Sequence, residues 1–415
     1  LFNLFVAFEI LLLSSYALMC LGASREQLRH AYKYVMLNLL GSTFFVLGAG
    51  LVYGLTGTLN FADLAAFVAD ANARGESLPP GFQAVSMVLL FVFALKAAVF
   101  PLWFWLPDTY HTCPIAICAL FGGLLTKVGV YALFRIFPMA FAAPGLTDSG
   151  GFITIVSFAA GFSLIIAILG AIAMRSIRRL LALTLMSHIG YFAFGLALMT
   201  PDAMTGAIFY MVQHMVVMAA LFLCCGAIEM YAGTDDLQKM GGLLNRAPWL
   251  AVLFFIAAVS LIGLPPTSGF YGKVLLLAEG FRAADRGFWI LSLLGVITSI
   301  LTLVAMGKVW TQAFWSPERV EAAPDHTWLT PAPRNLAPVY AGAVLLVIIS
   351  ITAAFAAEPL TRVSRLAADS LTQPRGYVAA VLGESAWPGA LATEAPPEAQ
   401  TTAVDVDQHH KGSAH

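Results

Sequence analysis

The stretch that decides the fold reads Met87-Val-Leu-Leu-Phe-Val-Phe-Ala-Leu-Lys96-Ala-Ala-Val-Phe-Pro101-Leu-Trp-Phe-Trp-Leu-Pro107-Asp108. It is an apolar run of membrane-helix character, with Lys96 in its middle and Pro101 five residues later. A proline removes a backbone donor and disfavours helix in the residue before it, so the helix is predicted to break just after the lysine. Lipid offers no partner for the freed backbone groups or the charge. The stretch therefore predicts a broken membrane helix that carries an ion and faces protein or a water-filled path.

Composition assigns the chain to the membrane proteins. Of its 415 residues, 60% are hydrophobic and only 11% are charged, and the mean hydropathy is +0.83. This is too little polar surface to cover a soluble globule. The net charge of -1 gives no basic field for a nucleic acid. The five cysteines lack the spacing of a metal site or a disulfide framework, and no nucleotide loop or catalytic triad is apparent. We expect no metal, no cofactor and no enzyme activity.

Ten stretches have the roughly 20 apolar residues that a helical span needs, if broken stretches count once. They cover residues 2–21, 32–56, 82–105, 114–137, 151–173, 178–199, 203–230, 247–283, 287–312 and 338–357. Nine spans, two of them broken, form a bundle over residues 1–312. A cytoplasmic loop is predicted over 313–337 and the last span over 338–357. Residues 358–415 are predicted to be a polar exterior tail, partly disordered, because its later part is too rich in Ala, Pro, Thr and Glu to bury a core.

The eighth span is also broken, at Gly263-Leu-Pro-Pro-Thr-Ser-Gly269, and Lys273 follows the break. The third and eighth spans are five apart in order, so the two broken helices start from opposite sides of the membrane. Such an arrangement is typical of an inverted repeat. The predicted fold is an all-α polytopic membrane protein with inverted five-helix repeats and two discontinuous helices.

Lys and Arg are distributed unevenly between the two sides of this predicted bundle. One side receives Arg25, Arg29, Arg175, Arg178, Arg179, Lys239, Arg246, Arg319 and Arg334. The other receives Arg74, Arg282 and Arg286 before the tail. The positive-inside rule makes the first side cytoplasmic and places both chain ends outside. Residues 59–77 are predicted to be a short helix in the outer interface.

Six ionisable side chains lie deep inside apolar spans. They are Glu9, Lys96, Lys127, His188, His214 and Lys273. At about 1.5 Å per residue each lies roughly 12 to 20 Å from the end of its span, near the bilayer midplane. A charge there costs about 2.5–3.5 kcal/mol on insertion scales. A single buried histidine or ion pair can simply fix helix packing, but six such residues favour a proton pathway.

The chemistry of such a row follows from its residue types. Burial disfavours the ammonium form of a lysine, whereas a nearby carboxylate favours it. A change in the distance between Glu9 and Lys96 would therefore load or discharge the lysine. Lys127 and the two histidines are expected to relay the proton through water toward Lys273.

Three motifs together resemble a known family. They are Lys96-Ala-Ala-Val-Phe-Pro-Leu-Trp-Phe-Trp-Leu-Pro-Asp108, Thr126-Lys-Val-Gly-Val-Tyr131 and Gly263-Leu-Pro-Pro-Thr-Ser-Gly-Phe-Tyr-Gly-Lys273. They are similar to motifs of the antiporter-like subunits shared by respiratory complex I and the Mrp multisubunit cation/proton antiporters. With Phe2-Asn-Leu-Phe-Val-Ala-Phe-Glu9, the chain looks most like the Mrp D subunits. The resemblance covers about residues 1–312.

The resemblance implies roles for the six residues. Glu9 and Lys96 match the coupling pair of the family, Lys127 matches its central relay lysine, His188 and His214 match its hydrated histidines, and Lys273 matches its terminal lysine. The family has fourteen spans with the glutamate in the fifth, so four amino-terminal spans are expected to be missing. One departure is Met218, where several relatives carry a lysine. Water or His214 would have to bridge that position.

The resemblance implies a proton-translocating subunit of a multisubunit Na+(K+)/H+ antiporter in the bacterial plasma membrane. Its expected partners are other membrane subunits, the lipid bilayer, and protons with Na+ or K+ as the coupling ion. The alternative is a proton-pumping subunit of complex I or of a membrane-bound hydrogenase, driven by electron transfer. A structural scaffold with inert buried pairs would not explain a lysine beside each of the two helix breaks.

Overall fold

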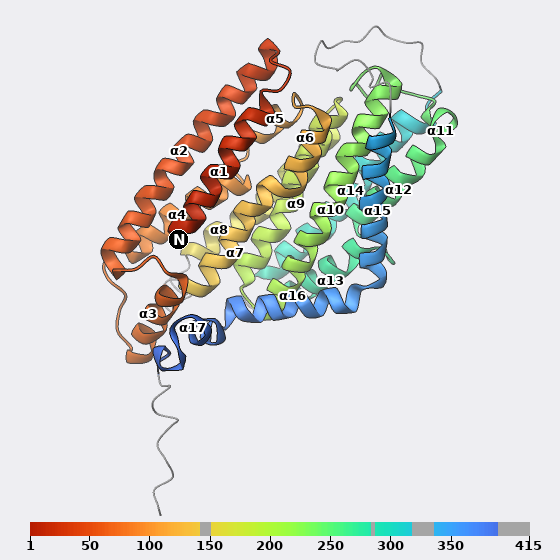
Figure 1. The fold of residues 1–415 in the computed structure, drawn as a ribbon. Helices are drawn as coiled ribbons and strands as arrows, with labels where there is room; N and C mark the ends of the chain where they lie inside the picture. Colours follow the sequence, from red (N-terminus) through yellow and green to blue (C-terminus); the bar gives the residue numbers. More distant parts are fainter. Residues whose placement is uncertain (142–150, 284–286, 318–335, 389–415) are drawn as a thin grey trace, which may run out of the picture.

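The computed structural model describes residues 1–141, 151–283, 287–317 and 336–388, and these residues are almost entirely helical (Figure 1). Within these ranges the only β-type pairing is one isolated bridge between Ser176 and Asp236. The prediction of an all-α protein is confirmed. The predicted cations Arg286, Arg319 and Arg334 lie outside the described residues, as do most of the predicted loop 313–337 and the end of the tail.

The elements follow one another along the chain with short connections. They are α1 (Phe2–Met19), α2 (Arg25–Thr56), α3 (Phe61–Arg74), α4 (Phe82–Ala97), α5 (Leu106–Tyr110), α6 (Ile115–Leu120), the π-helix η1 (Phe121–Leu125), α7 (Thr126–Ala140), α8 (Gly151–Ala173), α9 (Ile177–Leu198), α10 (Pro201–Ala232), α11 (Leu243–Arg246), α12 (Pro248–Ile262), α13 (Ser268–Arg282), α14 (Phe288–Val309), the π-helix η3 (Trp310–Trp315), α15 (Ala337–Phe355), α16 (Ala357–Thr372), α17 (Arg375–Leu382) and the 3-10 helix η4 (Glu384–Ala386).

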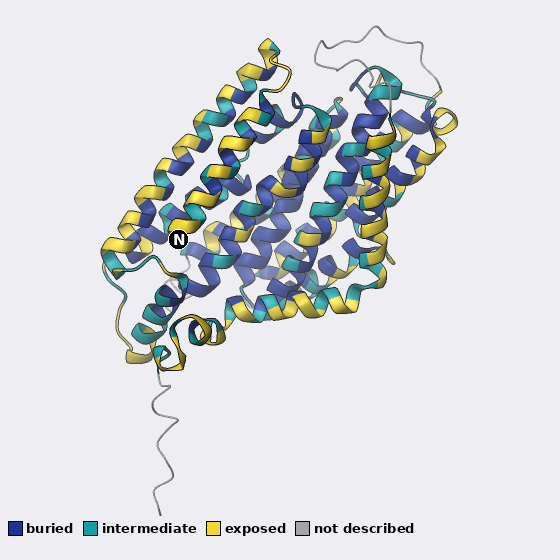
Figure 2. Cartoon of the chain, viewed as in Figure 1, coloured by how far each residue is buried: buried dark blue, intermediate teal, exposed yellow. Residues whose placement is uncertain are grey.

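The spans form one bundle of roughly parallel rods (Figure 1). In the described ranges, eight helical segments are long and apolar enough to cross a membrane. Two shorter apolar helices, α4 and α12, stand where the sequence predicts broken spans. Helix α9 is almost wholly buried at the centre, whereas α1, α2 and α15 expose apolar side chains on their outer faces (Figure 2). This distribution is expected of a bundle whose outer surface meets lipid.

Both predicted breaks are present. Helix α4 ends at Ala97, one residue after Lys96, and the next residue, Ala98, has a left-handed backbone with φ of 57°. Helix α12 ends at Ile262, where Gly263 adopts φ of 85°, and α13 begins five residues further on at Ser268. A left-handed residue ends a helix and leaves the carbonyls of its last turn free for other donors.

Close helix packing holds the first break in place. A Cβ atom added to Gly129 of α7 would lie 2.5 Å from the backbone nitrogen of Ala97. Only glycine lets α7 approach the end of α4 this closely. The side chains of α7 and α4 therefore keep a fixed register next to Lys96.

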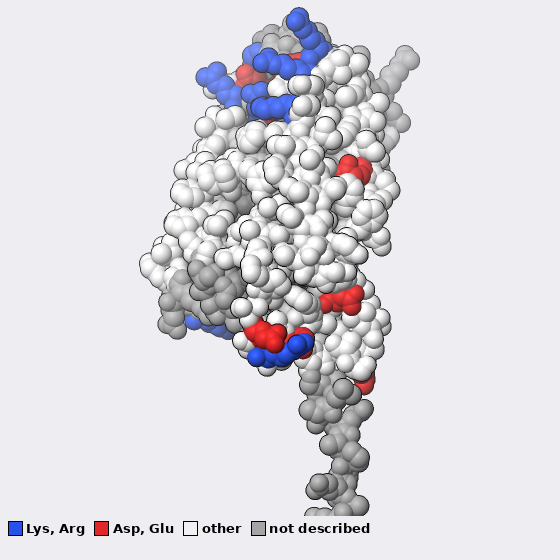
Figure 3. Space-filling model, turned by 90° about the vertical axis from the view of Figure 1, so that its left-hand side faces the viewer, with Lys and Arg blue, Asp and Glu red and all other residues white. Residues whose placement is uncertain are grey.

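Cations gather at one end of the bundle, which we call the cation-rich end (Figure 3). It is made by the start of α2, the connection between α8 and α9, and the residues after α10. Several contacts hold these segments together, including Glu26 of α2 near His111 and Arg178 of α9 bonded to the carbonyl of His111. The middle of the face in Figure 3 is mostly uncharged, as lipid contact requires.

The structure differs from the predicted polar tail over its first part. Helix α16 runs across the end of the bundle opposite the cation-rich end, and α17 lies next to α3 (Figure 1). Ser364, Ala368 and Leu371 of α16 are buried at helical spacing, so a narrow face of small and apolar residues packs on the bundle. Compositional reasoning missed this face because polar residues surround it. The short helix predicted over residues 59–77 is α3.

Candidate functional site

The first part of the buried row joins three helices at one hydroxyl. Ser42 of α2 donates a short hydrogen bond to the carboxylate of Glu9 of α1, and the Lys96 ammonium of α4 donates to the same Ser42 oxygen at 3.3 Å. Lys96 is 4% exposed and its Nζ lies 5.0 Å from the centre of the Phe8 ring. Glu9 and Lys96 are therefore brought together, but through Ser42 and not as a direct ion pair.

Lys127 lies directly after a π-helical turn. Its ammonium donates to the carbonyl of Gly122, which belongs to η1. A π-helix is often found at functional positions, because the extra residue turns neighbouring side chains and frees backbone carbonyls. Lys127 is 2% exposed. Among the described residues, no direct hydrogen bond joins Lys127 to Lys96 or to either central histidine.

The two central histidines form an aromatic cluster with tyrosines. His188 of α9 meets Tyr210 of α10 at 2.5 Å through Nδ1 and Thr302 of α14 at 3.2 Å through Nε2. Its ring centre lies 5.3 Å from that of His214. Both nitrogens of His188 therefore have partners, and His188 can both accept and donate a proton.

Lys273 closes the row at the second helix break. Its ammonium donates to the carbonyls of Leu261 and Ile262 at 3.0 and 2.9 Å and to Ser299 Oγ at 3.1 Å. The two carbonyls belong to the last turn of α12, where the helix dipole is negative. Tyr191 bonds to the same serine at 2.9 Å, which joins Lys273 to the aromatic cluster.

Several buried polar atoms near this row have no protein partner in the described structure. They are both ring nitrogens of His214, the side-chain oxygens of Thr126 and Thr298, and Oε1 of Gln213. Buried polar atoms are nearly always satisfied, and ordered water is the usual partner when protein is not. Water molecules near His214 would supply the link between Lys127 and the histidines that the side chains alone do not make.

Reasoning from the sequence found the charged members of the row but missed the hydroxyl groups that connect them. These are Ser42, Tyr191, Tyr210, Ser299 and Thr302. Serine, threonine and tyrosine are common in membrane helices, so their residue types alone gave no signal. The spacing of Ser42 behind other polar residues of α2 was an available signal.

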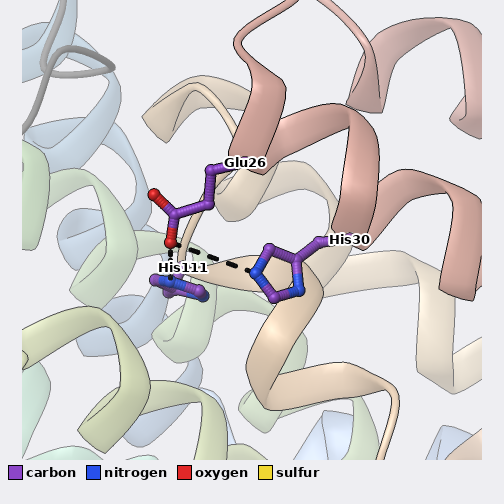
Figure 4. Close-up of side chains that lie close together, drawn as sticks. All are labelled: Glu26, His30 and His111. Carbon is purple, nitrogen blue, oxygen red and sulfur yellow. Dashed lines mark ion pairs between the residues drawn. The ribbon is translucent and has the colours of Figure 1, made fainter.

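A second polar cluster lies at the cation-rich end (Figure 4). Glu26 Oε1 is 4.0 Å from His30 Nε2 and 3.7 Å from His111 Nε2. Within the described ranges these are the only three residues whose ligand atoms could together hold a metal ion. However, Arg179 Nη2 lies 3.2 Å from His111 Nε2, and a fixed positive charge beside a ligand atom disfavours a metal cation.

The protonation of this cluster is set by burial and by its cations. Burial, followed by the Arg179 guanidinium, lowers the pKa of His111 to about 4. The neutral imidazole then donates from Nδ1 to the carbonyl of Asp108, at 2.8 Å. Burial raises the pKa of Asp108, but the bond and charge of Lys33 outweigh it, so the pKa of that carboxyl lies below its ordinary value.

Beside this cluster, Arg178 of α9 makes a buried ion pair with Glu229 of α10. Arg178 Nε donates to Glu229 Oε1 at 2.7 Å and Nη2 donates to Oε2 at 2.5 Å, while Nη1 donates to the carbonyl of Cys113 at 2.7 Å. The pair therefore fixes the segment between α5 and α6 against the centre of the bundle. Loss of one partner would leave a buried charge uncompensated.

Comparisons with known proteins agree on one family. The family model for the transmembrane region of NADH:quinone oxidoreductase and Mrp antiporters matches residues 1–302. The chain is 41% identical over 385 residues to the D subunit of the Na(+)/H(+) antiporter of Alkalihalophilus pseudofirmus, covering 92% of this chain and 74% of that protein. It matches a chain of the Mrp complex from Dietzia sp. with a TM-score of 0.78 and 32% identity, covering 92% and 76% of the two chains. A chain of a membrane-bound sulfane sulfur reductase, an archaeal respiratory membrane complex, matches with a TM-score of 0.79 and 26% identity, covering 92% and 74%.

Proposed function

The chain belongs to the NADH:quinone oxidoreductase/Mrp antiporter membrane family, and from this premise we propose that it moves protons as a subunit of a multisubunit Na+(K+)/H+ antiporter. It is a multi-pass protein of the bacterial plasma membrane and part of a secondary transporter, not an enzyme. Its partners are the other membrane subunits of an Mrp-type complex.

The observation that carries the proposal is the shared hydroxyl at the first helix break. Ser42 contacts both the Glu9 carboxylate and the Lys96 ammonium, and Lys96 is one residue from the end of a broken helix. A carboxylate stabilises the ammonium form of a nearby lysine in a low-dielectric site. A small shift of the end of α4 would change this stabilisation, so the pair can take up and release a proton as the complex changes conformation.

From Lys96 the proposed route continues through Lys127, water near His214, and His188 to Lys273. The unpartnered nitrogens of His214 support a hydrated centre, and the bonds of His188 with Tyr210 and Thr302 support a residue that relays protons. Met218 is fully buried, so the departure from the lysine seen in several relatives leaves an apolar side chain in this region. Water and His214 take over that step in our proposal.

We assign the cation-rich end to the cytoplasm, on the positive-inside rule. Helix α16 and the outer interface helix α3 then lie on the exterior side of the membrane. The assignment can be tested separately by labelling single cysteines placed at the start of α2 and in α16 from either side of intact cells.

The function is tested in everted membrane vesicles that contain the complete complex. A pH gradient is imposed, and the recovery of a pH-sensitive dye is followed after Na+ or K+ is added. Cation-induced recovery in wild type, and its loss in Lys96→Ala and Glu9→Ala at equal assembly, is the expected result. If wild type does not respond to cations but acidifies the vesicles when a reductant and a quinone are supplied, the chain belongs to a redox-driven pump and the proposal is wrong.

A further inference from the structure

Polar residues follow one ridge of α2 from the cation-rich end to the first helix break. Every fourth residue of this ridge is polar, and the members are Glu26, His30, Tyr34, Asn38 and Ser42. Side chains four apart in a helix are neighbours, stacked one turn above the other. We call this set the α2 ridge. It begins at an exposed glutamate and ends at the hydroxyl that joins Glu9 to Lys96.

The deeper members of the α2 ridge are buried although they are polar. Tyr34, Asn38 and Ser42 are 0%, 4% and 5% exposed. The Tyr34 hydroxyl meets Ser15 Oγ of α1 at 2.8 Å, and the amide of Asn38 donates to the carbonyl of Tyr34 at 2.9 Å. Polar groups within a membrane cost several kcal/mol each when they are left unsatisfied. Apolar residues at these positions would hold α2 in the bundle without that cost.

The spacing of the ridge suits a chain of alternating side chains and water molecules. Four residues of helix rise by about 6 Å. Two hydrogen bonds of about 2.8 Å each, from one side chain to a water molecule and on to the next side chain, span a similar length. One water molecule between successive members would therefore make the ridge continuous.

The outer end of the ridge has groups that exchange protons with the aqueous phase. Glu26 is exposed and His30 is half-buried, and the ring of His30 lies 5.3 Å from that of the buried His111 (Figure 4). Three other charged groups face this cluster, and they are Lys33 and Asp108, which bond to each other, and Arg179 beside His111. A carboxylate and two imidazoles at a membrane surface can collect and release protons near neutral pH.

We propose that the α2 ridge, with Glu26, His30 and His111 at its outer end, is the path by which protons exchange between the cation-rich side and the Glu9–Lys96 pair. This inference rests on the proposed function, since it adds a path to the same proton-carrying pair. Tyr34 and Asn38 are positioning residues that hold the water chain, and His30 is the exchanging group at its mouth.

The test uses the complete complex in everted vesicles and compares ridge variants with matched controls on the same helix. Tyr34→Phe removes one hydroxyl, and its control is Tyr32→Phe, since Tyr32 is 68% exposed. Asn38→Leu removes the amide, and its control is Thr43→Val, since Thr43 is exposed and bonds only within its own helix. Each ridge variant should lower cation-driven proton exchange about tenfold or more, the effect of losing roughly one hydrogen bond to a relay. The controls should stay near the wild-type rate.

A fourth variant separates a proton path from a packing role. His30→Ala should lose exchange and regain it when imidazole is added on the cytoplasmic face, because a soluble imidazole can replace a proton carrier but not a packing contact. Wild-type rates in both Tyr34→Phe and Asn38→Leu, or a loss in His30→Ala that imidazole does not restore, would overturn the inference. If instead wild type itself shows no cation response, the proposed function fails and not the path alone.

Discussion

Replacing Ser42 by alanine should uncouple Glu9 from Lys96 without removing either charge. The hydroxyl donates to the carboxylate and accepts from the ammonium at 3.3 Å. A hydrogen bond to a charged group contributes about 1.5–3 kcal/mol net. Two are lost here, but water can enter the space of the hydroxyl and replace part of them. The smaller value of a single bond up to about twice that is therefore expected, which slows exchange by about tenfold to a hundredfold.

The assay is cation-driven proton exchange in everted vesicles, normalised to the amount of assembled complex. Ser42→Thr keeps the hydroxyl and should retain most of the activity. Ser14→Ala is the matched control, because Ser14 of α1 is exposed and bonds only to the carbonyl of Ile10. If Ser42→Ala exchanged protons as fast as wild type, the shared hydroxyl would have no part in coupling and our reasoning about the pair would be refuted.

Three further predictions concern packing, the aromatic cluster and pH. Gly129→Ala places a Cβ 2.5 Å from the backbone of Ala97 and should lower the stability of the complex by about 1–3 kcal/mol in thermal unfolding, whereas Gly50→Ala, in open space, should be neutral. Equal melting temperatures of the two variants would count against the packing argument. Tyr210→Phe removes the bond to His188 and should slow proton exchange about tenfold, whereas Tyr53→Phe, 58% exposed, should not; equal rates in the two would exclude the phenol from the relay. His111 has a pKa of about 4 in the folded protein against an ordinary 6.5, so the folded state takes up its proton less readily; the stability from neutral His111 is present above about pH 6.5 and is lost as the pH falls toward 4. Thermal stability should therefore fall less steeply over that window in His111→Gln than in wild type, and parallel curves would contradict this.

The sequence predicts the spans and breaks well because membranes impose simple rules on both. Long apolar runs must be helical, and prolines beside a buried lysine mark where the helix ends. Lys96 and Lys273 were identified in this way, and each lies next to an observed break. Buried charge is expensive enough to stand out against an apolar background, which is why the charged members of the row were recognised.

The connections between these residues were not predictable in the same way. Whether Ser42 faces Glu9 or lipid depends on the rotation of α2 in the bundle, which packing sets. The π-helix before Lys127 has no sequence signature that we could use, since Phe121-Gly-Gly-Leu-Leu125 also suits an ordinary helix. Helix α16 was missed because small buried residues such as Ala368 give a weak apolar pattern. In each case tertiary packing, and not local preference, decides the outcome.

The most direct test of the central claim is the proton flux of the purified complete complex in proteoliposomes, with wild type compared with Lys96→Met. This substitution keeps the length and packing of the side chain but removes the charge that Ser42 and Glu9 hold. We predict that a Na+ or K+ gradient drives proton movement in wild type and that Lys96→Met, assembled to the same extent, falls to the rate of empty liposomes. Proton movement at the wild-type rate in Lys96→Met would contradict the account, because the proton would then cross the membrane without the broken-helix lysine.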